Sequence, residues 1–147
     1  FPTLVVSPLT TSVGLVKKKR SSKVIAPKIS DAEWEVMNVL WASAEPVKAS
    51  EVLEWLPPER QWAQKTVNTF LARLVDKQAV SVHREGRSNM YAAVVAREEC
   101  VSGEVSSLVR RVFRGAPGPM LMHFIKNETL SDEEIDQLKS MLEDKRP

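Results

Sequence analysis

The segment from Trp62 to Val94 constrains the fold most, because its hydrophobic period changes from helical to extended partway along. In its first half, apolar residues gather on one face at about 100° per residue. They are Val67, Phe70, Leu71, Leu74 and Val75. The opposite arc carries hydroxyl groups and cations, namely Lys65, Thr66, Thr69 and Arg73. This pattern predicts a helix from Ala63 to about Lys77 with one packing face and one free polar face.

The second half of the segment predicts a β-hairpin. After Ala79 the period falls to two, with Val80 and Val82 alternating inward, and the run Met90–Val94 returns as a partner strand. We therefore expect two short antiparallel strands directly after the helix.

The hairpin turn is expected between Arg84 and Asn89, where Gly86 and Asn89 tolerate a positive φ. Arg84 and Arg87 would make its tip basic. A basic hairpin beside a helix with a free polar face is typical of a winged helix-turn-helix, in which the helix enters the major groove of DNA and the wing lies on phosphates.

Two amphipathic segments precede the predicted helix at Ala63–Lys77. Ser30 followed by Glu33 is the signature of a capping box and predicts the start of a first helix. A second helix, with Val52 and Leu56 inward, ends before Pro57 because proline cannot continue the hydrogen-bond ladder. Trp62 can start a minor strand that pairs with the wing. The order of three helices and a hairpin predicts a winged module over residues 29–95.

Charge is distributed unevenly along the chain, although the net charge is only +2. Residues 1–28 hold six Lys and Arg and no acidic residue, so we expect a flexible basic tail or an expression remnant. Such a tail either touches phosphates or is dispensable. Residues 61–94 carry five cations (Lys65, Arg73, Lys77, Arg84 and Arg87) against two acids, Asp76 and Glu85. The predicted winged segment is therefore locally positive, as a DNA-binding surface requires.

Residues 96–147 predict three further helices and no strand. A long helix ends near Gly115, a shorter one follows, and Ser131 with Glu134 repeats the capping box at the start of the last. Each of these helices has only a narrow apolar face, so three of them cannot enclose a hydrophobic core. This part of the chain therefore either folds back on the winged module or dimerises, and we favour a homodimer. The expected interface residues are Val101, Val105, Leu108, Val109, Val112, Leu121, Phe124, Ile125, Leu138, Met141 and Leu142.

Several classes of function are excluded by composition. Cys100 with His83 and His123 cannot supply a four-ligand structural metal site, and no nucleophile–base pair can be placed. No apolar run approaches the roughly 18 residues of a membrane span. We expect a soluble, cytoplasmic protein without enzymatic activity, metal or cofactor.

An ordered set of segments resembles the penicillinase and methicillin-resistance repressor family over about residues 29–144. They are ISDAEWEVMNVLW, KTVNTFLARLVDK, REGRSNMY, LVRRVFRGA and LSDEEIDQLKSMLED. The resemblance implies a homodimeric transcriptional repressor of antibiotic-resistance genes, with the N-terminal module on a palindromic double-stranded operator and the C-terminal helices as dimerisation domain.

The resemblance also assigns roles to single residues. It implies recognition-helix contacts by Lys65, Thr66, Asn68, Thr69 and Arg73, and wing contacts by Arg84 and Arg87. Asn68 stands where many relatives carry a cation, so the operator sequence is not transferred.

The resemblance implies a mode of release as well. In members that respond to β-lactams, a membrane sensor with metalloprotease activity leads to cleavage within the long helix, and the matching bond here is Ser107–Leu108. Copper-responsive relatives carry paired cysteines near the C-terminus, whereas this chain ends in LEDKRP. Copper sensing by that route is excluded.

Two alternatives to a DNA-binding repressor controlled by proteolysis remain open. A winged-helix domain can bind a protein through its hairpin and free helix face, and a repressor can sense a small ligand directly. The local basic excess disfavours the first, and the narrow C-terminal stripes leave little lining for the pocket that the second needs.

Overall fold

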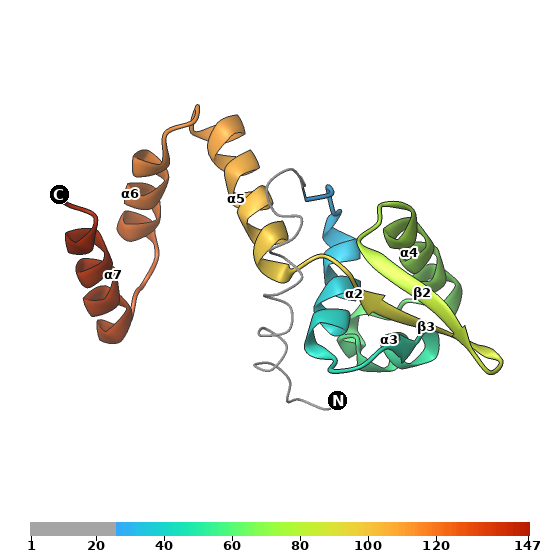
Figure 1. The fold of residues 1–147 in the computed structure, drawn as a ribbon. Helices are drawn as coiled ribbons and strands as arrows, with labels where there is room; N and C mark the ends of the chain where they lie inside the picture. Colours follow the sequence, from blue (N-terminus) through green and yellow to red (C-terminus); the bar gives the residue numbers. More distant parts are fainter. Residues whose placement is uncertain (1–25) are drawn as a thin grey trace. The chain divides into compact units, whose positions relative to one another are not determined.

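The computed structural model describes residues 26–147, in which helices dominate and a small three-stranded sheet forms the only β-structure (Figure 1). The elements follow the chain as α2 (Asp31–Ala42), β1 (Val47–Lys48), α3 (Ala49–Trp55), the 3-10 turn η1 (Pro58–Arg60), α4 (Gln64–Asp76), β2 (Val80–Glu85), β3 (Ser88–Ala93), α5 (Arg97–Val112), α6 (Pro117–Asn127) and α7 (Asp132–Asp144). The expected basic tail lies outside the described residues except for its last three.

Both capping boxes are confirmed. The Ser30 hydroxyl accepts a hydrogen bond from the Glu33 backbone N–H (3.2 Å), and the Glu33 carboxylate accepts one from the Ser30 N–H (3.0 Å). Ser131 and Glu134 make the same reciprocal pair at 3.1 and 2.9 Å. Each pair satisfies amide groups that have no partner within a helix's first turn, so α2 and α7 begin where the sequence indicated.

The hairpin is tighter than predicted. β2 and β3 pair from Val80 opposite Ala93 to Glu85 opposite Ser88, so only Gly86 and Arg87 form the turn. Gly86 has a φ of 69°, which the first position of a two-residue type II′ turn requires. Arg84 and Asn89 face each other within the strands, and the expectation that Asn89 belongs to the turn is wrong.

The hairpin strands are also less buried than their alternation suggested. Val80 is buried, but Val82 is 40% exposed. The helices therefore cover only the base of the hairpin, and its turn end extends beyond them (Figure 1).

The minor strand is β1, not a strand at Trp62. Val47 pairs antiparallel with Tyr91, and Lys48 with Met90, which makes β3 the central strand in the order β1-β3-β2. Trp62 instead packs its ring edge-on against Phe70, with the centroids 5.1 Å apart.

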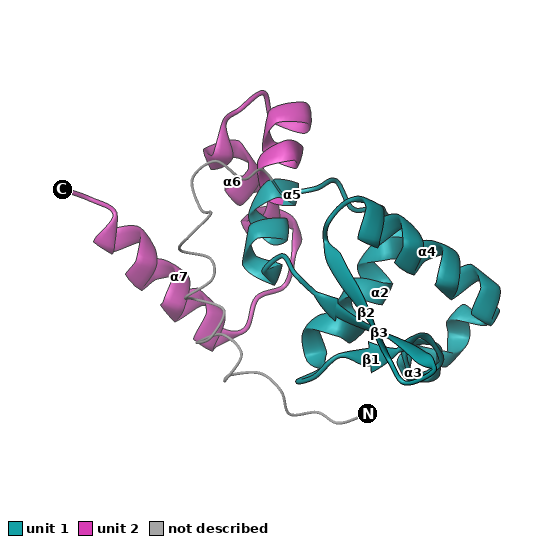
Figure 2. Cartoon of the chain, turned by 45° about the vertical axis from the view of Figure 1, so that its right-hand side comes forward, with its two compact units in different colours: residues 1–104 teal, residues 105–147 magenta. Residues whose placement is uncertain are grey.

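The chain forms two compact units, and the boundary between them falls between Glu104 and Val105, inside α5 (Figure 2). All fully buried hydrophobic side chains lie in the first unit, where α2, α3 and α4 pack together with the sheet. Trp41 closes this core by donating a hydrogen bond from Nε1 to the Val95 carbonyl oxygen (3.0 Å). The last buried residue of the core along the chain is therefore Cys100, in the first part of α5.

The second unit, residues 105–147, has no buried side chain. Nine of its large apolar residues are exposed to between 37% and 64%: Val105, Val112, Leu121, Met122, Phe124, Ile125, Ile135, Met141 and Leu142. Leu108, Val109 and Leu138, which are also expected at the interface, are partly buried. The apolar side chains on these helices are therefore not covered by a hydrophobic core within the second unit.

Between residues 26 and 147, no helix combines the length and the apolar character that crossing a membrane requires.

Candidate nucleic-acid interface

The inward face of α4 anchors this helix to the module. Val67, Leu71 and Leu74 are completely buried, and Phe70 and Val75 are partly buried against the same core. Helix α4 packs on α2, α3 and β2 through this face. The packing face that the sequence predicted is confirmed, and it determines which side of α4 remains free.

The outward face of α4 carries the polar residues. Lys65, Asn68, Thr69 and Arg73 are exposed, whereas Thr66 is partly buried. No carboxylate within residues 26–147 forms an ion pair with Lys65 or Arg73. The charges of both cations are thus available to an anionic partner.

Two of these side chains already make hydrogen bonds along the helix. The Thr69 hydroxyl donates to the Lys65 carbonyl oxygen (3.0 Å), so its proton is engaged and its oxygen can only accept. This arrangement favours contact of the Thr69 methyl group with a base over donation to a phosphate. Asn68 Oδ1 accepts a hydrogen bond from Gln64 Nε2 (3.1 Å).

Arg73 lies at one end of a chain of aromatic and cationic contacts that the sequence did not predict. Its guanidinium carbon lies 6.0 Å from the centroid of the Phe70 ring, and Phe70 in turn packs on Trp62. Arg60 lies over the other ring of this pair, 5.5 Å from the Trp62 centroid, and is held by an ion pair with Glu35 at 2.8 Å. Cation–π contacts of this length restrict the side chain of Arg73 without neutralising it.

The wing places its two arginines differently. Arg87 is a turn residue, and Arg84 lies within β2. Both are exposed, and neither has an ion-pair partner in the described part of the chain. The hairpin therefore offers two free cations near its outer end.

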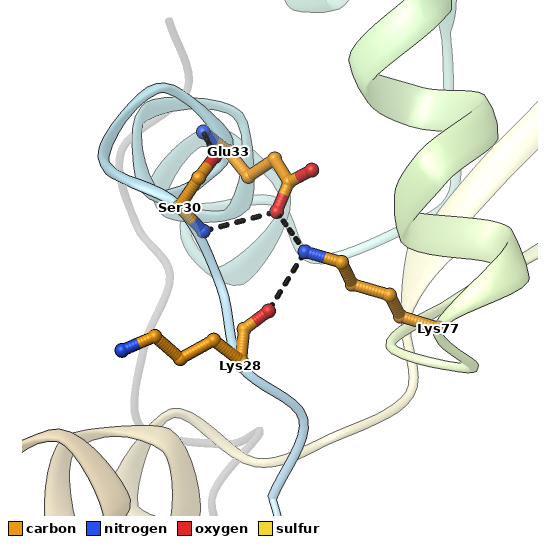
Figure 3. Close-up of polar contacts among 4 residues, drawn as sticks. All are labelled: Lys28, Ser30, Glu33 and Lys77. Atoms are coloured by element: carbon orange, nitrogen blue, oxygen red, sulfur yellow. Dashed lines mark hydrogen bonds and ion pairs between the residues drawn. The ribbon is translucent and has the colours of Figure 1, made fainter. Parts of the chain in front are cut away.

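Lys77, one of the five cations of residues 61–94, is engaged inside the module and is not free. Its ammonium group contacts the Glu33 carboxylate and donates to the Lys28 carbonyl oxygen at 2.7 Å (Figure 3). Burial would raise the pKa of Glu33, but hydrogen bonds and charge from Lys77, with the hydrogen bonds from Ser30, outweigh it and lower the pKa. The free positive charge of this surface comes from Lys65, Arg73, Arg84 and Arg87.

The residues expected at a dimer interface lie on α5, α6 and α7. Val101 is in the part of α5 that belongs to the first unit, and the remaining ten are in the second unit. Ser107 and Leu108 are consecutive residues within α5, and the Ser107 hydroxyl accepts a hydrogen bond from Arg111 Nη1 (3.1 Å). Within residues 26–147, no three His, Cys, Asp or Glu side chains gather as metal ligands.

Comparison with known proteins identifies the family. The family model described as penicillinase repressor matches residues 29–144. The penicillinase repressor of Bacillus licheniformis is 36% identical over 118 residues, which cover 80% of this chain and 91% of that protein. The methicillin resistance regulatory protein MecI of Mammaliicoccus sciuri is 28% identical over 118 residues, covering 80% of this chain and 95% of that protein.

Among solved structures, the monomeric form of Bacillus licheniformis BlaI in complex with the blaP half-operator is 38% identical. The match covers 50% of this chain and 88% of the BlaI chain, with a TM-score of 0.43. The matching family model and the Bacillus licheniformis relative are both named as penicillinase repressors. On the match over residues 29–144, this chain belongs to the penicillinase repressor family.

Proposed function

We propose that this chain represses transcription by binding double-stranded operator DNA through α4 and the hairpin. The observation that carries the proposal is the division of α4 into two faces. Val67, Leu71 and Leu74 are completely buried, and the exposed side bears Lys65 and Arg73 without ion-pair partners among the described residues. Cations on the exposed face of a helix whose other face is anchored in the core suit the phosphates and base edges of a duplex.

The dimensions of the surface agree with docking in a major groove. An α-helix with its side chains is about 10–12 Å in diameter, which a major groove about 12 Å wide admits, and the 13 residues of α4 extend roughly 20 Å along their axis. Lys65 and Arg73 can bind guanine edges or phosphates, and Thr66 and Thr69 can pack on thymine methyl groups. Arg84 and Arg87 of the hairpin would then hold flanking phosphates.

We also propose that the working form is a homodimer on a palindromic operator. The support is the second unit, whose apolar side chains on α6 and α7 have no core to bury them. Contiguous exposed apolar surface in a soluble chain marks an interaction site, and a second copy buries both stripes in a single symmetric contact.

Release by proteolysis at Ser107–Leu108, after a signal from a β-lactam or cell-wall sensor in the membrane, completes the proposal. This bond lies just beyond the boundary between the two units, so its cleavage would separate the DNA reader from the dimerising helices. Because the bond is inside helix α5, a protease would have to unwind this part of the helix first.

The proposal can be tested by binding to two duplexes, one carrying an operator selected from random sequence and one scrambled. We expect Arg73→Ala and Thr69→Ala to cost about 1–3 kcal/mol on the operator and little on the scrambled duplex, if they touch base edges. Arg87→Ala should weaken binding to both duplexes similarly and reduce the salt slope by about one.

Arg146→Ala is the matched control, because it removes the same charge from an exposed residue at the C-terminal end. It should leave the binding of both duplexes unchanged. If none of the three surface variants changes affinity, α4 and the hairpin do not contact DNA. Operator binding that is insensitive to salt would favour a protein partner for this surface instead.

A further inference from the structure

Gln64, in the first turn of α4, uses a single nitrogen atom for two hydrogen bonds. Its Nε2 donates to the Ala49 carbonyl oxygen at the start of α3 (3.0 Å) and to Asn68 Oδ1 one turn further along α4 (3.1 Å). An amide nitrogen carries two hydrogens, so both donors of Gln64 are engaged. Gln64 thereby links α3, α4 and the exposed side chain of Asn68.

This link determines which way the Asn68 amide faces. The Ala49 carbonyl oxygen can only accept, so Gln64 must turn its nitrogen, and not its oxygen, toward α3. The second hydrogen on this nitrogen is accepted by the oxygen of the Asn68 amide, one helical turn away. Asn68 Nδ2, with two donors and no partner in the described part of the chain, is left for a ligand.

An asparagine that reads adenine uses both amide atoms, because the adenine edge presents one acceptor, N7, and one donor, the N6 amino group. Because Oδ1 is turned toward Gln64 and bonded to it, the opposite end of the planar Asn68 amide is Nδ2, which presents donors. In the major groove, the guanine edge presents two neighbouring acceptors, N7 and O6, and no donor.

We propose that Gln64 is a specificity-determining positioning residue, which orients Asn68 so that it selects guanine over adenine in the operator. This inference rests on the proposed binding of α4 in a major groove. Gln64 does not itself touch the base, and its effect is exerted through the orientation of one amide.

The test is selection of bound duplexes from a random pool by the full chain and three variants. Asn68→Ala identifies the operator position that Asn68 reads, because preference at that position is lost. We expect guanine there in the unaltered chain. In Gln64→Ala the Asn68 oxygen is released, and adenine at the same position should gain about fivefold or more relative to guanine. The matched control, Gln137→Ala on the exposed face of α7, should keep guanine.

Gln64→Glu is a second Gln64 variant, which also gives up the bond to the Ala49 carbonyl oxygen but places an acceptor beside Asn68, so it differs from Gln64→Ala only in what it offers Asn68. A carboxylate accepts from Asn68 Nδ2 and so turns Oδ1 outward, which should favour bases that present an amino group, adenine or cytosine.

Three results would overturn the inference while leaving operator binding intact. They are adenine at the Asn68-dependent position in the unaltered chain, an unchanged preference in both Gln64 variants, and no position that depends on Asn68. Failure of every protein, including the unaltered chain, to enrich any sequence would instead refute DNA reading by α4 itself.

Discussion

The ammonium group of Lys77, at the C-terminal end of α4, contacts the carboxylate of Glu33 in the first turn of α2, and the Glu33 side chain is only 3% exposed. Glu33 also completes the capping box of α2, and Lys77 also holds the Lys28 carbonyl oxygen. One ion pair therefore joins the end of α4, the beginning of α2 and the chain that leads into it. It helps to hold the C-terminal end of α4 on the module.

The first prediction concerns the pH dependence of this ion pair. The pKa of Glu33 is lowered below its ordinary value of 4.5, so its ionised form stabilises the fold above that pH, and this contribution is lost as pH falls through the lower folded pKa. We expect Glu33→Gln to cost about 1–3 kcal/mol at neutral pH and to flatten the acid loss of stability. Urea unfolding from neutral pH to below 4.5 measures both effects. Glu45→Gln, at an exposed site, should retain the acid loss of the unaltered chain.

The second prediction concerns the end of α4, which Gln78 closes in the left-handed conformation with a φ of 64°. The Gln78 and Ala79 N–H groups donate to Val75 and Leu74 carbonyl oxygens, both at 2.9 Å, as in a Schellman cap. Glycine adopts this conformation without a clash at Cβ, so Gln78→Gly should raise the free energy of unfolding by about 0.5–1 kcal/mol. Gln137→Gly, inside α7, should instead lower it by about 1 kcal/mol if α7 unfolds in the same transition. A loss of stability in Gln78→Gly would contradict this account.

The third prediction concerns the exposed stripe of the second unit. A Leu108→Glu, Val112→Glu variant should shift the chain to monomer and weaken operator binding, because it places unpaired charge in the proposed interface. Sedimentation at micromolar concentration measures the first effect. Val82→Glu, on the wing, makes a similar change outside that interface and should leave the dimer intact. A monomeric unaltered chain with full operator affinity would refute the dimer.

The fourth prediction concerns release from the operator. A fragment that ends at Ser107 keeps the whole buried core, which runs from Ile29 to Cys100, and should unfold cooperatively. It should bind the full operator about 10²–10⁴-fold more weakly than the intact chain, because two half-site contacts are no longer joined. Equal affinity of fragment and intact chain would mean that derepression does not depend on separating the two units.

The fifth prediction concerns Cys100, which is 4% exposed at the edge of the core. Burial, with the nearby charges of Glu99 and Glu104, raises the pKa of its thiol to about 11. Because the thiolate is the reactive form, a thiol reagent at neutral pH should modify the native protein much more slowly than the urea-unfolded chain. Equal rates in the two states would show that Cys100 is not enclosed.

Much of the candidate DNA-binding surface could be predicted because the signals are local. The 3.6-residue repeat places Val67, Leu71 and Leu74 on one side of α4 and therefore Lys65 and Arg73 on the other. A capping box is complete within four residues, which is why the starts of α2 and α7 were predicted correctly. The face and the ends of a helix follow from neighbours along the chain.

Features that depend on distant partners were decided only by the tertiary structure. Strand β1 is two residues long and has no period of its own, and it exists because Tyr91 and Met90 pair with it. Val82 has the alternation of an inward residue, but the helices cover only the base of the hairpin. In the sequence Lys77 is one of several cations in this segment, whereas in the folded structure its charge is paired with Glu33. The sequence by itself determined which residues form α4 and its polar face, since helix geometry acts between near neighbours. Folding alone decided that Lys77 is not a free cation, because its partner Glu33 lies 44 residues away along the chain.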